Sequence, residues 1–204
     1  NISLFDIPIT SFEGLTPNNY IFAAHHAFSS SITSIDDVGV TTWSKRFTDG
    51  ISLYIGDVKK DVALNRYYVC GGDNSGPAFL MFLDPLGNLI SARNFSIAEA
   101  DGASFNRVIK TSDGGYVCVG TVTGYGPGGG EVKFSAITHN PPECSGSKTE
   151  SIQSPLIVKF DASGNHVWHQ VFRYYTGSVA PANRIYNDAS FVDVVEVSDG
   201  YIAI

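Results

Sequence analysis

The chain has 204 residues, which is enough to bury a sizeable core in one domain or at most two. Only 16% of its residues are charged and 12% are aromatic, with 21 glycines and a single methionine, a composition typical of an all-β protein with short strands and many turns. The net charge of −7 is spread without a block of like charges and no long apolar run occurs, so we expect neither nucleic-acid binding nor membrane insertion.

One sequence unit recurs along the chain, and its first anchor is a tyrosine. The segments NNYIFAA, RYYVCGG, GGYVCVG and DGYIAI align so that the first two steps are each 48 residues long. The tyrosines that this alignment places in register are Tyr20, Tyr68, Tyr116 and Tyr201. A repeat of this length is typical of stacked structural units rather than of one continuous fold.

The second anchor is an aspartate followed three residues later by a glycine. It occurs in SIDDVGVTTW, FLDPLGNLIS and KFDASGNHVW, at Asp36, Asp84 and Asp161. Aspartate bonds to the backbone of its own turn and glycine accepts a positive φ, so this pattern indicates a tight hairpin turn. Because a catalytic carboxylate is normally unique, its repetition favours a structural role.

The third unit shows the strands that each unit is expected to contain. Its β-branched and aromatic segments, separated by turn residues, are 103–111, 116–122, 155–160 and 166–172. Four short antiparallel strands repeated at this spacing describe the blade of a β-propeller. We therefore predict an all-β chain of about three and a half blades that is part of a larger propeller, with approximate boundaries at 1–48, 49–96, 97–173 and 174–204.

These residues also resemble a known group of repeats. SDGGYVCVG followed by LIVKFDASGNHVW is similar to the DG-containing, delta-60-like propeller repeats of bacterial secreted and cell-surface proteins. The resemblance covers the second to fourth units, and it is loose in the first, where LTPNN replaces the SDGG turn. It implies an extracellular or cell-surface propeller, but no single activity, because such folds host enzymes, lectins and interaction platforms alike.

Two insertions mark the end of the blades at which binding is expected. In an up-and-down blade alternate turns point the same way, so the tight turns share one end and the long connections share the other. The connections at 124–154 and 173–188 are long, and loops of this length are usually functional or disordered. Tyrosine and arginine are enriched at recognition hot spots. The candidate binding residues in or beside these loops are Tyr125, Arg173, Tyr174, Tyr175, Arg184 and Tyr186.

A smaller candidate cluster involves His25 and Asp73, which follow the tyrosine-led strands of the first two units. Equivalent positions converge toward one rim of a propeller, so these two side chains could approach one another, although a solvated or hydrogen-bonded histidine is the simpler interpretation. Cys70 and Cys118 fall at the same place in successive units and are interpreted as small buried residues. No metal-ligand spacing is present, and we expect no metal and no cofactor.

The absence of a catalytic signature, together with the fold, favours a non-catalytic interaction or ligand-binding propeller. Its ligand would be a protein or a glycan. One alternative is a carbohydrate-active hydrolase or lyase whose active site includes blades outside this chain. A second alternative is a structural subunit of a surface assembly, in which open blade edges pair between chains.

Overall fold

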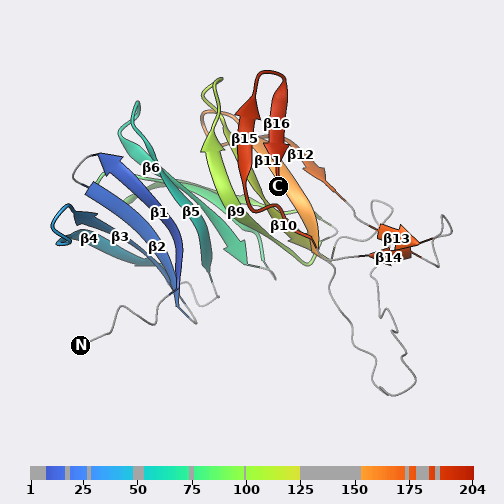
Figure 1. The fold of residues 1–204 in the computed structure, drawn as a ribbon, viewed down its shortest axis with the longest axis horizontal. Coiled ribbons are helices and arrows are strands. Elements are labelled where there is room, and N and C mark those ends of the chain that lie inside the picture. Colours follow the sequence, from blue (N-terminus) through green and yellow to red (C-terminus); the bar gives the residue numbers. More distant parts are fainter. Residues whose placement is uncertain are drawn as a thin grey trace, which may run out of the picture.

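A computed structural model describes residues 8–16, 19–26, 29–47, 53–73, 76–98, 100–124, 153–172, 175–177, 184–186 and 189–204. All of the regular structure in these ranges is β-strand. The strands form an open arc, with the first sheet at one side and the last hairpin beside the third sheet (Figure 1). The chain is a partial β-propeller, as the sequence predicts.

The sheets follow one another along the chain, and each is antiparallel with its strands in sequence order. The first sheet consists of β1 (Ile9–Thr16), β2 (Asn19–His26), β3 (Ser29–Asp36) and β4 (Thr41–Phe47). The second consists of β5 (Tyr54–Asp61), β6 (Arg66–Asp73), β7 (Ala78–Leu83) and β8 (Leu89–Phe95). The third consists of β9 (Gly102–Lys110), β10 (Tyr116–Thr123), β11 (Gln153–Phe160) and β12 (His166–Val171). Two hairpins follow, β13 (Tyr175–Gly177) with β14 (Arg184–Tyr186) and β15 (Val194–Val197) with β16 (Gly200–Ala203).

Consecutive sheets pack face to face, and a separate apolar core lies in each gap. One core joins the first and second sheets, the next joins the second and third, and a smaller one joins the third sheet to β15 and β16. Strands β7 and β10 are therefore buried along their whole length, while the outer strands β4, β8 and β12 are mostly exposed. Middle strands enclosed on both faces and exposed outer strands are the burial pattern of stacked propeller blades.

The second and third sheets approach so closely that they share hydrogen bonds. Gly72 and Asp73 of β6 pair with Ser104 and Ala103 of β9, which joins the two sheets into one network of eight strands. Glycine makes this approach possible, because a Cβ at Gly72 would lie 2.5 Å from the Ala103 carbonyl oxygen. The expectation of separate four-stranded sheets is therefore modified at this junction.

The hairpin registers correct the alignment of the second unit by one residue. Tyr20 pairs with Ile35 and Tyr116 pairs with Phe160, each directly before the turn aspartate. In the second sheet the residue in this place is Tyr67, which pairs with Leu83. The prediction that Tyr68 is equivalent to Tyr20 and Tyr116 is therefore wrong.

The physical reason for the error lies in the side-chain alternation of a strand. A shift of one residue exchanges the two faces of the strand, and adjacent tyrosines in RYYVCGG disguise the shift. Tyr67 belongs to the core shared with the first sheet and contacts Trp43 at a ring-centroid distance of 5.7 Å. Tyr68 points the other way and lies 5.2 Å from the ring of Tyr116.

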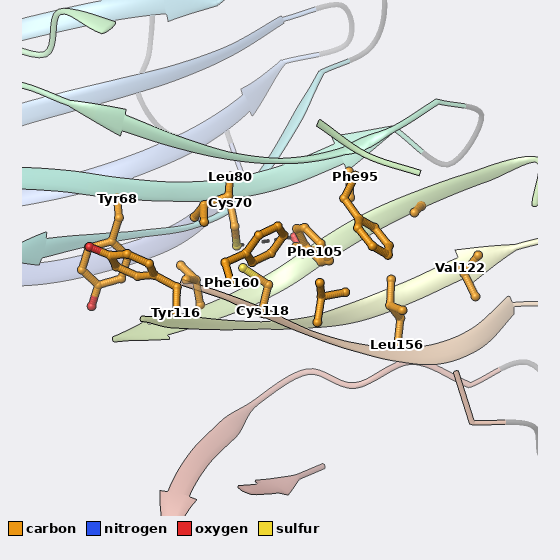
Figure 2. Close-up of a cluster of buried hydrophobic side chains, with 14 of the residues drawn as sticks. Tyr68, Cys70, Leu80, Phe95, Phe105, Tyr116, Cys118, Val122, Leu156 and Phe160 are labelled. Atoms are coloured by element: carbon orange, nitrogen blue, oxygen red, sulfur yellow. Dashed lines mark hydrogen bonds between the residues drawn. The ribbon is translucent and has the colours of Figure 1, made fainter. Parts of the chain in front are cut away.

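The same correction applies to the cysteines. Cys70 lies three residues after Tyr67, whereas Cys118 lies two residues after Tyr116, so their strand positions are not equivalent. Both are buried, as expected, but they belong to the same core and their thiols point toward one another from the second and third sheets (Figure 2). Burial, with a hydrogen bond to Cys118, raises the pKa of the Cys70 thiol well above its ordinary value.

The turn aspartates have the structural role that the sequence predicts. The Asp84 carboxylate accepts hydrogen bonds from the amides of Leu86 and Asn88 at 2.9 and 2.8 Å. Asp36 and Asp161 accept the equivalent pairs of bonds in their own turns. The following glycines have φ between +77° and +83°, a left-handed conformation that favours glycine.

Candidate binding site

A row of polar side chains crosses the first strands of the sheets. Strand pairing places Ser11, Asp57 and Arg107 opposite the residue three positions after the aligned tyrosine, and Asp193 directly precedes β15 in the matching place. The Ser11 hydroxyl donates to Asp57 Oδ1 at 2.6 Å, Arg107 Nη1 lies 3.6 Å from the same oxygen, and Arg107 Nε lies 3.0 Å from Asp193 Oδ1. The row thus links four consecutive first strands.

Asp57 is the buried centre of this row. Its carboxylate also accepts hydrogen bonds from the backbone amides of Val58 at 3.0 Å and Val108 at 3.3 Å. Burial raises the pKa of Asp57, and the lowering effects of Ser11 and Arg107 do not fully offset it. A fully bonded carboxylate in this position holds the β5–β9 junction together, since each of its partners comes from a first strand.

A second polar cluster lies toward the tight-turn end of the same strands. Asp61 Oδ1 is 2.7 Å from Lys110 Nζ, and Asp61 Oδ2 accepts a 3.1 Å hydrogen bond from the Tyr116 hydroxyl. Arg66 in turn donates to the Tyr116 hydroxyl at 2.8 Å. Burial alone would raise the pKa of Asp61, but the hydrogen bonds from Lys110, the Leu64 amide and Tyr116 outweigh it and lower the pKa.

These two clusters show how the charged groups near the first strands are used. Their carboxylates and cations are paired with one another or with backbone amides, which is the arrangement of a structural network. Among the residues that the structure describes, no three potential metal ligands come together. Likewise, the described part of the chain has no helix suited to spanning a membrane. The candidate binding residues predicted from the sequence belong to the opposite, long-loop end of the strands.

His25 lies at that end, and the structure gives it different neighbours from those considered in the sequence. Its ring Nδ1 is 3.2 Å from the Ser30 hydroxyl, and its ring packs edge-on against Tyr54 at 5.7 Å. Ser30 in turn donates to the Leu53 carbonyl at 2.6 Å. The backbone of Asp73 pairs with β9, while its side chain lies outside the described part of the structure, so the proposed His25–Asp73 cluster stays a prediction.

The two insertions leave the third sheet at one place. The first ends where β11 begins, and both ends of the second are bonded to the start of β11, through Phe172 to Pro155 and through Ala189 to Gln153. Within the second insertion, β13 and β14 form a two-stranded ribbon that the sequence did not predict. Its register places Tyr175 opposite Tyr186 and Gly177 opposite Arg184.

Three of the candidate binding residues lie outside the described residues. They are Tyr125, Arg173 and Tyr174. The described backbone therefore brings together three members of the predicted set, Tyr175, Arg184 and Tyr186, on one short ribbon. It does not place His25 on that ribbon, because His25 belongs to the first sheet.

A pair of histidines on β12, the outer strand of the third sheet, was not predicted from the sequence. His166 Nε2 and His169 Nδ1 lie 3.1 Å apart, and both rings contact Phe95 of β8. Partial burial, together with the neighbouring His166, lowers the pKa of His169. The sequence signal for this pair was the spacing HVWH directly after a turn. A bulge in the β11–β12 pairing changes the usual alternation of side chains between the two faces there.

The strand order, the registers and the stacked cores define this chain as an arc of consecutive β-propeller blades. No protein-family profile and no curated protein sequence matches it. Among solved structures, a variant of the Synechocystis apocarotenoid oxygenase is similar with a TM-score of 0.46 and 11% identity, over 83% of this chain and 40% of that chain. An ACO/RPE65 chimera has a TM-score of 0.43 and 10% identity, over 82% of this chain and 40% of that one.

A protein of unknown function from Bacteroides caccae has a TM-score of 0.35 and 13% identity, over 81% of this chain and 67% of that one. The chain thus spans 40% of the length of the apocarotenoid oxygenase variant.

Proposed function

We propose that this chain is a non-catalytic, ligand-binding part of a β-propeller, located outside the cell or at its surface, and that it binds a protein or a glycan at the long-loop end. The observation that carries the proposal is the ribbon of β13 and β14, which pairs Tyr175 with Tyr186 beside the root of the other insertion. A ligand needs a particular, non-repeated constellation, and aromatic rings supply large contact area at modest entropic cost.

The bonding of the other polar groups supports the long-loop end as the binding end. The carboxylates of the repeated turns bond to their own turn amides, and the charges near the first strands bond to one another. Groups engaged in this way build the scaffold. Loops held at one end of a rigid scaffold are where binding residues are most often found.

The test compares the ribbon with a repeated turn. Tyr175→Ala and Tyr186→Ala should each weaken binding by roughly 1–3 kcal/mol if these rings are anchors, with little change in the melting temperature. Asp84→Ala should lower the melting temperature and leave affinity nearly unchanged, because it removes turn bonds far from the ribbon.

Binding is measured by screening the folded chain against a glycan array and a panel of extracellular protein domains, followed by titration of each hit with all three variants. Equal loss of affinity in the tyrosine variants and in Asp84→Ala, at unchanged stability, would show that the binding site is not at the long-loop end.

A further inference from the structure

Strand β12 brings two imidazoles together on the face of the third sheet that is turned toward the second sheet. His166 lies opposite Phe160 and His169 lies opposite Val158, and both of these partners belong to the core between the two sheets. Residues directly opposite one another in an antiparallel pair have their side chains on the same face. The bulge after Lys159 makes this possible, because residues three apart on a regular strand point to opposite faces.

The two rings are held in place by Phe95, a buried residue of the same core at the end of β8 (Figure 2). The Phe95 ring lies 5.5 Å from the His166 ring and 5.4 Å from the His169 ring, and the two imidazoles are 5.2 Å apart. Both histidines are nevertheless exposed to solvent. Rings that already pack on a fixed side chain lose less freedom when they bind a ligand, so the pair is partly preorganised.

The distance between the facing ring nitrogens suits a shared metal ion. His166 Nε2 and His169 Nδ1 are 3.1 Å apart. With metal–nitrogen distances of about 2.0–2.1 Å, two nitrogens on one ion are about 2.9 Å apart at a right angle and about 3.3 Å apart at the tetrahedral angle. The observed separation lies between these two values, so the strand needs no rearrangement to supply two neighbouring ligands.

The kind of donor selects the class of ion. Imidazole nitrogen suits Zn²⁺, Ni²⁺ and Cu²⁺, whereas Mg²⁺ and Ca²⁺ prefer oxygen ligands. Within the described ranges of the chain, no third histidine, cysteine or carboxylate joins the pair. Water or a donor from another molecule would therefore complete the coordination, as in sites that keep open positions.

We propose that His166 and His169 bind one divalent transition-metal ion, of the class of Ni²⁺, Zn²⁺ and Cu²⁺, at the outer strands of the second and third sheets. The ring that donates the present hydrogen bond moves its proton to its other nitrogen, and both rings turn so that their lone pairs converge on the ion. Ligand spacing in the sequence predicts no such site, because the bulge that puts both histidines on one face is not visible there. The site lies on β12 and is independent of the ribbon of β13 and β14.

Isothermal titration calorimetry of the folded chain with Ni²⁺ measures the site, near pH 7.5 so that imidazoles with an ordinary pKa of about 6.5 are mostly neutral. We expect saturable binding that a chelator reverses. His166→Gln and His169→Gln should each weaken it at least about tenfold, because even changes to residues behind a metal ligand have effects of this size. His25→Gln is the matched control, since it removes an imidazole that bonds to Ser30 in the first sheet.

Thermal melting provides a second reading. An ion that binds the folded chain raises its melting temperature, so Ni²⁺ should stabilise the parent and His25→Gln but neither His166→Gln nor His169→Gln. Melting without the ion shows that each variant is folded, and Mg²⁺ in place of Ni²⁺ should have no effect on any of them. A parent chain without saturable Ni²⁺ binding overturns the proposal, as does binding that survives undiminished in either His166→Gln or His169→Gln.

Discussion

The first and second sheets are built from the same unit, yet they differ in how completely they are enclosed. Both have four antiparallel strands in sequence order and a turn aspartate between the third and fourth strands. The second sheet has neighbours on both faces, and its third strand, β7, is buried at every residue. Among the residues that the structure describes, the first sheet has a neighbouring sheet on one face only, and β3 is partly exposed at four of its eight residues. The burial of a repeat position is therefore decided by the neighbouring sheet.

The largest expected difference is at Val58 and Phe12, which are equivalent because each pairs with the residue two positions after the aligned tyrosine. Val58→Asp should destabilise the fold by more than about 4 kcal/mol, because it places a carboxylate in a closed apolar core. Phe12→Asp should change the free energy of unfolding by less than about 1 kcal/mol in dilute solution. Denaturant unfolding of both variants checks this, and similar losses in the two would show that Phe12 is as enclosed as Val58.

Glycine at the close approach of β5 and β9 gives the next largest effect. A Cβ at Gly56 would lie 2.1 Å from the Phe105 carbonyl oxygen, whereas one at Gly14 in the first sheet would meet only the Tyr20 ring at 3.9 Å. Gly56→Ala should therefore cost about 2–3 kcal/mol of stability. Gly14→Ala, the matched control, should be nearly neutral. Thermal melting distinguishes the two, and an unchanged melting temperature for Gly56→Ala would mean that the strands can separate freely.

Two ion pairs of nearly equal length differ in how far they are exposed to solvent. Lys59–Glu13 joins the first and second sheets at 2.6 Å with both side chains about a quarter exposed, while Lys110–Asp61 joins the second and third at 2.7 Å with Asp61 only 1% exposed. Asp61→Asn should cost about 2 kcal/mol at neutral pH. Glu13→Gln should cost less than about 1 kcal/mol because solvent screens the pair. Denaturant unfolding of the parent chain and of each variant, at low and at high salt, measures both losses of stability.

The contributions of Asp61 and Asp57 to stability are expected to change with pH in opposite directions. The pKa of Asp61 is lowered in the fold, so its contribution is present above its ordinary value of about 3.9 and is lost as the pH falls through the folded pKa. The loss caused by Asp61→Asn should therefore shrink in acid. The pKa of Asp57 is raised, so the parent should gain stability relative to Asp57→Asn as the pH falls toward the ordinary value. Unfolding free energies measured from pH 7 downward test both signs, and parallel curves would contradict them.

The smallest effect is expected for the first insertion. The pairing of β10 with β11 extends to Thr123 and Gln153, so the strands are complete without the connection between them. Replacing residues 125–152 by a short glycine-serine linker should change stability by less than about 2 kcal/mol, because the entropy of loop closure varies slowly with length. A larger loss on thermal melting would show that the insertion is a packed element.

Much of the fold follows from local sequence. The turns at Asp36, Asp84 and Asp161 form wherever aspartate can bond to its own turn amides and glycine can adopt a positive φ, and both requirements are local. The recurrence of these turns with a tyrosine-led strand was enough to predict four-stranded units stacked as a propeller. The ribbon of β13 and β14 could not be predicted in this way, because its three-residue strands carry no periodic pattern.

Local sequence is sufficient to specify the repeated unit: its strands, its tight turns and the end at which the insertions emerge. Which face each residue occupies depends on contacts between segments far apart in the chain. Strand β6 is buried on both sides, so hydrophobicity does not distinguish Tyr67 from Tyr68, and only the pairing of Tyr67 with Leu83 fixes the register. Through that register the thiols of Cys70 and Cys118 share one core, and Asp57 reaches the amide of Val108. These contacts join residues far apart in sequence, which is why local patterns could not specify them.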